Sequence, residues 1–281
     1  MFEYPTGMIN VIAVDLDGTL LRSDSTVSAR TVAALARAGV AGARVVIVTA
    51  RPPRFTLTLA AEAGVTGVAV CSNGAIVADL ATGVMEIVGP MPIETARRTA
   101  AAVAVALPGA AFAVETGHRA LIGPGYGHIA TRDRERFAME TLDELWAAES
   151  CVKLLAWTPD PVTDAVLERL RSVLVEVEVT YSGGVGMMEI SAVGVSKVDA
   201  LARLCAGWGA GPEQVVAFGD MPNDLSVLRW AGTAVAVANA HPAVLAAADR
   251  ITASNDDDGV AIMLEELFPG VPPVGVVRPC R

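Results

Sequence analysis

Residues 10–20 read NVIAVDLDGTL, an apolar run that ends at two carboxylates. The run at 10–14 predicts a buried parallel strand, because strands covered on both faces are apolar throughout. Asp15 and Asp17 follow two apart, so both project from one edge, and Gly18 lets the chain turn sharply after them. Ligands of open α/β sheets bind beyond the carboxyl ends of the strands. In that context we interpret the carboxylates as functional, rather than as an acidic turn that closes a strand.

Outward from this stretch, apolar strand patterns alternate with helical ones. Helices are predicted at 28–38 and 52–63, and strands at 44–48 and 67–70. The same rhythm returns from residue 196, where a helix begins, with strands at 215–218 and 233–237 and helices at 223–230 and 259–267. Strands that alternate with helices indicate a parallel sheet with right-handed crossovers.

The rhythm differs in the middle of the chain, where strand patterns follow one another. Strands are predicted at 75–78, 84–88, 111–114, 119–122, 151–157, 175–181 and 187–190, with helices at 92–106 and 161–174. Such runs are typical of an α+β unit with an antiparallel sheet. The fold class is therefore α/β, with one core (1–82 and 186–268), an inserted α+β domain (83–185) and a loosely ordered tail (269–281).

Composition excludes several classes of function. The formal net charge is −10, with no stripe of Lys or Arg, which disfavours nucleic acid. No segment reads as a membrane span or a signal peptide, so we expect a cytoplasmic protein. The four cysteines lie far apart and are expected to be reduced and packed as small apolar residues.

Three further motifs follow predicted strands or begin predicted helices. Thr49 ends the strand at 44–48, where its hydroxyl suits a phosphate oxygen. Ser196 and Asp199 form a capping-box-like helix start, and Lys197 between them is misplaced in a first turn unless it receives an anion there. Residues 219–224 read GDMPND and offer two carboxylates and an amide suited to Mg²⁺. Each motif alone also has a structural interpretation, as a strand end, a solvated lysine or an acidic loop.

A parallel sheet would bring all four motifs to one edge. The carboxylates gathered there would repel one another without a cation, so charge alone implies a divalent metal ion.

These residues carry a resemblance to the haloacid dehalogenase superfamily of phosphatases, and within it to the Cof-type branch. The four motifs match that family in order and spacing, and the resemblance covers nearly the whole chain outside the tail. Further Cof-type signatures are SNGA at 72–75, VANA at 237–240 and DDDGV at 256–260. The resemblance implies a Rossmann-like core that holds the site and a cap inserted between the second and third motifs.

The resemblance also assigns roles. It makes Asp15 the nucleophile and Asp17 the general acid/base. Magnesium would be held by the Asp15 carboxylate, the Asp17 backbone carbonyl and Asp220, with Asp224 supporting the metal's water shell or orienting a lysine. The phosphoryl oxygens would be bound by three side chains, namely Thr49, Lys197 and Asn223. The chain departs from the family at Ala50, where glycine is frequent, and at Met221-Pro222, and neither change removes a reacting group.

The function implied is Mg²⁺-dependent hydrolysis of small-molecule phosphomonoesters, such as sugar phosphates or phosphorylated cofactors, through an aspartyl phosphate. The motifs leave open a sugar phosphomutase and a non-catalytic metabolite-binding protein. A signalling receiver fits less well, because it lacks a large insert. The partner expected is a small phosphorylated molecule, and both a monomer and a homodimer stay open. Four side chains of the insert could bear on specificity or simply be exposed, namely Glu115, His118, Arg119 and His128.

Overall fold

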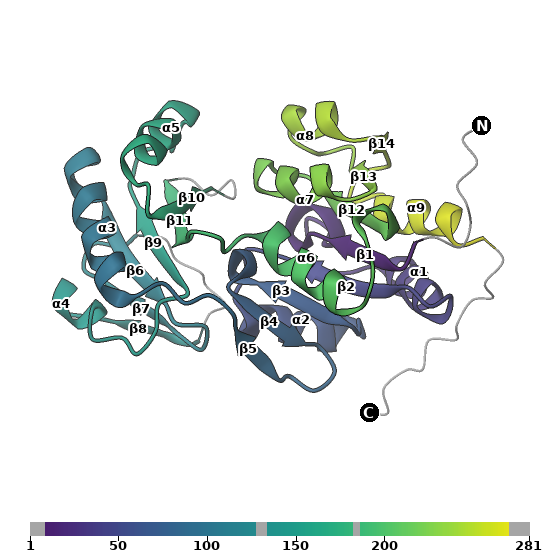
Figure 1. The fold of residues 1–281 in the computed structure, drawn as a ribbon, viewed down its shortest axis with the longest axis horizontal. Coiled ribbons are helices and arrows are strands. Elements are labelled where there is room, and N and C mark those ends of the chain that lie inside the picture. The colour runs from purple at the N-terminus through teal and green to yellow at the C-terminus, as the bar shows by residue number, and fades with distance from the viewer. Residues whose placement is uncertain (1–8, 128–133, 182–185, 270–281) are drawn as a thin grey trace.

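The structure is a computed structural model that describes residues 9–127, 134–181 and 186–269. Its larger sheet has eight strands in the order β14-β13-β12-β1-β2-β3-β4-β5 (Figure 1). The first six of these pair in parallel. Their bounds are β1 Val11–Val14, β2 Arg44–Val48, β3 Val68–Cys71, β12 Val215–Gly219, β13 Thr233–Ala236 and β14 Arg250–Ile251. The predicted α/β class with a parallel sheet is confirmed.

Helices cover both faces of the larger sheet. Along β1, Ile12 and Val14 pack into one apolar cluster, whereas Val11 and Ala13 pack into another, as the alternation of side chains along a strand requires. The first cluster includes residues of α1 (Ala29–Val40), α2 (Pro53–Ala63) and α9 (Gly259–Leu267). The second includes residues of α6 (Lys197–Gly207), α7 (Leu225–Trp230) and α8 (Pro242–Ala247). The apolar strands are therefore buried on both sides.

A smaller six-stranded sheet, with its helices here called the cap, lies beside the larger one (Figure 1). Its order is β10-β11-β9-β6-β7-β8, and all pairs are antiparallel except β7 with β8. The strands are β6 Ala111–Glu115, β7 Ala120–Ile122, β8 Arg136–Ala138, β9 Lys153–Trp157, β10 Val177–Thr180 and β11 Met187–Ala192. Helices α3 (Ile93–Ala106) and α5 (Asp164–Val173) share its apolar cluster, and α4 spans Leu142–Leu145. The antiparallel sheet expected for the middle of the chain is present.

Sheet membership changes at different residues from those predicted for the insert. Strands β4 (Ile76–Asp79) and β5 (Met85–Ile87) form antiparallel pairs that extend the edge of the larger sheet after β3. Strand β11 belongs to the smaller sheet. The chain therefore passes from the larger sheet to the smaller one after residue 83, and back again after residue 185. The sequence of a short hairpin carries no signal of which sheet it joins.

Other differences are local. The helix predicted from residue 223 begins at Leu225, after a 3₁₀ turn at Pro222–Asp224. Strands β8 and β14 and helices α4 and α8 were not predicted, since each is only two to six residues long. The tail from residue 270 and Cys280 lie outside the described residues, and the other three cysteines are free and buried, as expected. None of the helices in the described ranges combines the length and apolar character that a membrane crossing requires.

Candidate active site

Asp15 lies at the carboxyl end of β1, where its backbone N–H donates to the Phe218 carbonyl at 3.0 Å. This bond places it beside the end of β12, and its side chain is buried together with Asp220 and Asp224. One carboxylate oxygen from each of these three residues lies within 4.8 Å of the others. The parallel strands thus bring the first and fourth motifs together, as expected.

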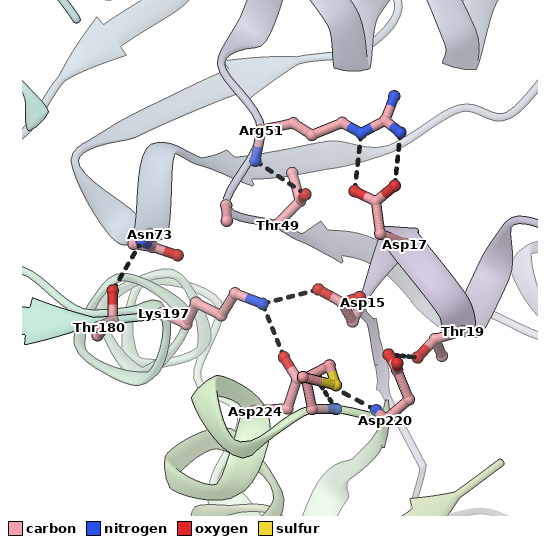
Figure 2. A network of polar contacts seen from close by, with 12 residues as sticks. Asp15, Asp17, Thr19, Thr49, Arg51, Asn73, Thr180, Lys197, Asp220 and Asp224 are labelled. Atoms are coloured by element: carbon pink, nitrogen blue, oxygen red, sulfur yellow. Dashed lines mark hydrogen bonds and ion pairs between the residues drawn. The ribbon is translucent and has the colours of Figure 1, made fainter. Parts of the chain in front are cut away.

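Lys197 joins this acidic group from the first turn of α6. Its Nζ donates to Asp15 Oδ1 and to Asp224 Oδ1, both at 2.7 Å, and its side chain is only 3% exposed (Figure 2). Burial opposes the charge on Lys197, but the two carboxylates outweigh it and raise the pKa above the ordinary value. Lys197 is therefore held in its charged form between two acids.

Burial and neighbouring carboxylates raise the pKa values of Asp15 and Asp220. Burial, and then the charge of Asp224, raise the pKa of Asp15 well above its ordinary value in spite of Lys197. Burial raises the pKa of Asp220 to about 6, against a hydrogen bond from Thr19 that lowers it. One lysine does not balance three buried carboxylates, and a divalent cation would stabilise their charged forms. The donor set, oxygen atoms within reach of one ion, fits Mg²⁺.

The loop after β1 and the turn after β12 hold these acids in place. Thr19 Oγ1 donates to Asp220 Oδ1 at 2.7 Å, and Asp224 Oδ2 accepts the backbone N–H groups of Asp220 and Met221 at 3.2 and 3.1 Å. Gly18 has φ +76°, and a Cβ there would lie 2.5 Å from Asp220 Oδ2. Glycine is thus required by both conformation and space. Thr19 belongs to the first motif, but no role was predicted for it.

Two of the predicted phosphate ligands also lie at strand ends near this edge. Thr49 follows β2 and is buried, and its Oγ1 accepts the Arg51 backbone N–H at 3.1 Å. Asn223 lies in the 3₁₀ turn before α7, and its buried Oδ1 has no hydrogen-bond partner among the described residues. Such an atom is rare unless a ligand or water brings it a donor, so a phosphoryl oxygen, itself an acceptor, would be bound by the amide nitrogen of Asn223 and not by this oxygen.

Asp17 has a different setting from Asp15. Its side chain is 54% exposed, and Arg51 Nε and Nη2 donate to its two carboxylate oxygens at 2.7 and 2.5 Å. Figure 2 shows this pair on the far side of Thr49 from Lys197, with the Asp17 carboxylate turned away from Asp15. The carboxylate of Asp17 is therefore not among the three that lie together, and the metal role predicted for the backbone carbonyl of Asp17 stays a prediction. Arg51 directly follows Thr49-Ala50 in the second motif, but no role was predicted for it.

Side chains of the cap reach the same loops. Lys153 of β9 donates to the Ala50 carbonyl at 2.8 Å and pairs with Glu189 of β11, and both side chains are buried. Glu115 of β6 is also buried, with a two-pronged pair to Arg54 at 2.7 and 2.8 Å. Glu115 is thus a cap–core contact rather than an exposed side chain. His118 is exposed, and His128 lies outside the described residues.

Comparisons with known proteins agree with this geometry. The sequence profile of the haloacid dehalogenase-like hydrolases matches residues 12–264. The 5-amino-6-(5-phospho-D-ribitylamino)uracil phosphatase YcsE of Bacillus subtilis is 28% identical, over 90% of this chain and 93% of that protein. Pyridoxal phosphate phosphatase YbhA of Escherichia coli is 30% identical, over 89% and 96%. A haloacid dehalogenase-like hydrolase structure from B. subtilis aligns with a TM-score of 0.80 at 25% identity, over 92% of this chain and all of that one. This chain therefore belongs to the haloacid dehalogenase-like hydrolases, within the Cof-type branch of phosphoric monoester hydrolases.

Proposed function

We propose that this protein hydrolyses small-molecule phosphomonoesters in a Mg²⁺-dependent reaction, through an aspartyl phosphate on Asp15. The observation that carries the proposal is the position of Asp15 at the end of β1, where it accepts a hydrogen bond from Lys197 and lies close to the carboxylates of Asp220 and Asp224. A nucleophile, a fixed cation and a metal-binding acid pair are the parts that phosphoryl transfer needs.

In the first step a carboxylate oxygen of Asp15 attacks phosphorus in line with the ester bond. The bond from phosphorus to the ester oxygen breaks, and its electron pair stays with that oxygen. Asp17 donates a proton there, so that the leaving group departs as an alcohol. The Asp17 carboxylate must first leave Arg51 and take up a proton from solvent, because both of its oxygens accept hydrogen bonds from the guanidinium in the present arrangement.

In the second step Asp17, now a carboxylate, takes a proton from water as that water attacks phosphorus. The bond between phosphorus and the Asp15 oxygen breaks, which regenerates the Asp15 carboxylate and releases inorganic phosphate. Asp17 ends the cycle protonated, as it began. Its exposure is consistent with access to solvent water.

The metal would be held by the carboxylates of Asp15 and Asp220 and the backbone carbonyl of Asp17, with Asp224 supporting the metal's water shell. When bound, Mg²⁺ supplies positive charge that offsets the negative charge of the phosphoryl oxygens. Lys197, with Thr49 and Asn223, would bind those oxygens. Preorganised donors of this kind supply most of the catalysis in phosphoryl transfer.

The substrates we propose are sugar phosphates or phosphorylated cofactors. The relatives named for a ribitylaminouracil phosphate and for pyridoxal phosphate support this class. A sugar phosphomutase is the second candidate, since it would use the same aspartyl phosphate. The net charge of −10 argues against a nucleic acid substrate. The cytoplasmic location stays a prediction, and a monomer and a homodimer both stay open.

The test is release of inorganic phosphate from p-nitrophenyl phosphate and from a set of sugar phosphates, with Mg²⁺ and then with EDTA. We expect metal-dependent release that is abolished in Asp15→Asn, which keeps the shape of the side chain but not its nucleophilicity. Isomerised sugar phosphate without free phosphate would favour the mutase instead. Near wild-type release by Asp15→Asn would contradict the mechanism.

A further inference from the structure

The turn at Ser72–Gly74 after β3 has an unusual backbone. Its three residues have φ of +50°, +57° and +105°, although two of them are not glycine. Backbones of this kind are strained for serine and, less so, for asparagine, and they persist where surrounding structure holds them, often at functional sites. Gly74 is packed so closely that a Cβ would lie 2.2 Å from the Ser196 carbonyl oxygen.

The Ser72–Gly74 turn contacts two elements that are predicted to bind phosphate, the loop after β2 with Thr49 and the first turn of α6 with Lys197. The Asn73 backbone N–H donates to the Thr49 carbonyl at 3.1 Å, and the Ser72 N–H donates to the Arg51 carbonyl at 2.9 Å. On its other side, Gly74 lies against the backbone of Ser196 and Lys197. Asn73 is therefore adjacent to the phosphate site, but it belongs to none of the four motifs.

The side-chain amide of Asn73 is oriented by the cap. Its Nδ2 donates to Glu189 Oε2 at 3.2 Å and to Thr180 Oγ1 at 3.3 Å. Burial favours the neutral form of Glu189, but Lys153 outweighs it and lowers the pKa of Glu189, which is therefore an ionised acceptor. A carboxylate can only accept a hydrogen bond, so the Asn73 nitrogen must face Glu189 and its oxygen must face the other way.

In this orientation, the side-chain oxygen of Asn73 has no hydrogen-bond donor among the described residues. Asn73 is 4% exposed, and its Oδ1 is buried. Figure 2 shows this oxygen on the opposite side of the amide from Thr180, toward Lys197 and Thr49. A buried acceptor without a donor is destabilising, and a ligand that brings a donor removes the penalty. Phosphoryl oxygens are themselves acceptors, so they do not fit this atom.

We propose that Asn73 Oδ1 is a subsite for the leaving group, where it accepts a hydrogen bond from a hydroxyl that the substrate carries close to its phosphate ester. The subsite selects polyol and sugar monophosphates over phosphate esters that lack hydroxyls. Glu189 is its positioning residue, because it fixes which end of the Asn73 amide faces the substrate. The inference rests on the proposed phosphatase function.

Asn73→Gly is the variant that tests it, since glycine adopts positive φ freely and the backbone contacts of the turn do not need a side chain. Phosphate release is measured from glycerol, ribitol and sorbitol monophosphates, and from phenyl phosphate, which has no hydroxyl. We expect the ratio of kcat/KM for the best polyol phosphate to that for phenyl phosphate to fall about tenfold, the loss of one hydrogen bond to a neutral group. Both substrates report on the same folded fraction, so a loss of stability cancels from the ratio.

Thr180→Val is the matched control. It removes the other partner of the Asn73 amide but leaves Glu189 to orient it, and the ratio is expected to stay at the wild-type value. An Asn73→Gly ratio equal to that of wild type, whether or not both rates fall, would overturn the subsite and leave the phosphatase function standing. Release of phosphate from none of these esters by the wild-type protein would instead remove the proposed function on which the subsite rests.

Discussion

At the scale of single residues, Asp15 and Asp17 of the first motif lie in different environments. Asp15 is buried against Lys197 and two further acids, whereas Asp17, two residues later, is half-exposed and held by Arg51. A nucleophile benefits from fixed charge around it, and a general acid/base benefits from access to leaving group and water. The D-x-D spacing was readable from the sequence. The Arg51 contact was not, because it joins two loops that only the folded sheet brings together.

Asp17→Asn tests the role of the more exposed carboxylate. The variant cannot donate the proton, so its kcat should fall by about 10²–10⁴ with an alkyl phosphate, whose leaving group is a poor one. With p-nitrophenyl phosphate the loss should be much smaller in the first step, because nitrophenolate departs without a proton. Rapid-mixing kinetics that resolve the first turnover measure this directly. Equal losses of that step with both esters would contradict a general-acid role.

At the scale of elements, capping and apolar patterning determined what could be predicted. Strand β2 and helix α9 begin and end at the predicted residues, because their apolar runs and flanking turns are distinct. Ser196 caps α6 as predicted, with its Oγ accepting the Asp199 N–H at 3.2 Å. The elements β8 and β14 have only three and two residues, and each is defined by pairing with the strand before it, so the local sequence carries little signal for them.

Ser196→Ala should lower both the stability of the protein and its catalytic rate, because Ser196 caps α6. Loss of the cap should lower the free energy of unfolding by about 0.5–2 kcal/mol, measured by urea denaturation. It should also lower kcat, because Lys197 is the next residue and its ammonium is placed by the first turn of the helix.

Ser28→Ala is a matched control, since Ser28 caps α1 by accepting the Thr31 N–H at 3.0 Å, in a helix that carries no predicted site residue. It should cost similar stability and leave kcat unchanged. If Ser196→Ala lost stability alone, the link between the cap of α6 and Lys197 would be refuted.

At the scale of the whole molecule, the predicted site residues come from both halves of the larger sheet, and the cap contacts the loops between them. The parallel order of β12, β1 and β2 explains why motifs up to about two hundred residues apart meet at one edge, and this much followed from the sequence. The contacts of Lys153, Glu189 and Glu115 did not, because strand patterns fix neither the pairing partner nor how two sheets lie against each other.

The buried pair of Lys153 and Glu189 should make stability depend on pH. Because the pKa of Glu189 is lowered on folding from 4.5, its charge stabilises the folded state above that pH, and the contribution is lost as the pH falls below it. Glu189→Gln should therefore lower the free energy of unfolding by about 3–5 kcal/mol at pH 7. The difference from wild type should shrink as the pH falls below 4.5. Urea denaturation of both proteins at pH 7 and at a pH below 4.5 measures this difference. A difference that did not change with pH would contradict the ionised pair.

The covalent intermediate is the central claim, and trapping it is the most direct test. The protein is mixed with Mg²⁺ and an excess of p-nitrophenyl phosphate, quenched in acid within one turnover, digested and analysed by peptide mass spectrometry. We predict one added phosphoryl group on the peptide that contains Asp15, located at that residue by fragmentation and absent from Asp15→Asn. Steady release of nitrophenol with no phosphoryl group on Asp15, or with one on another residue, would contradict the mechanism.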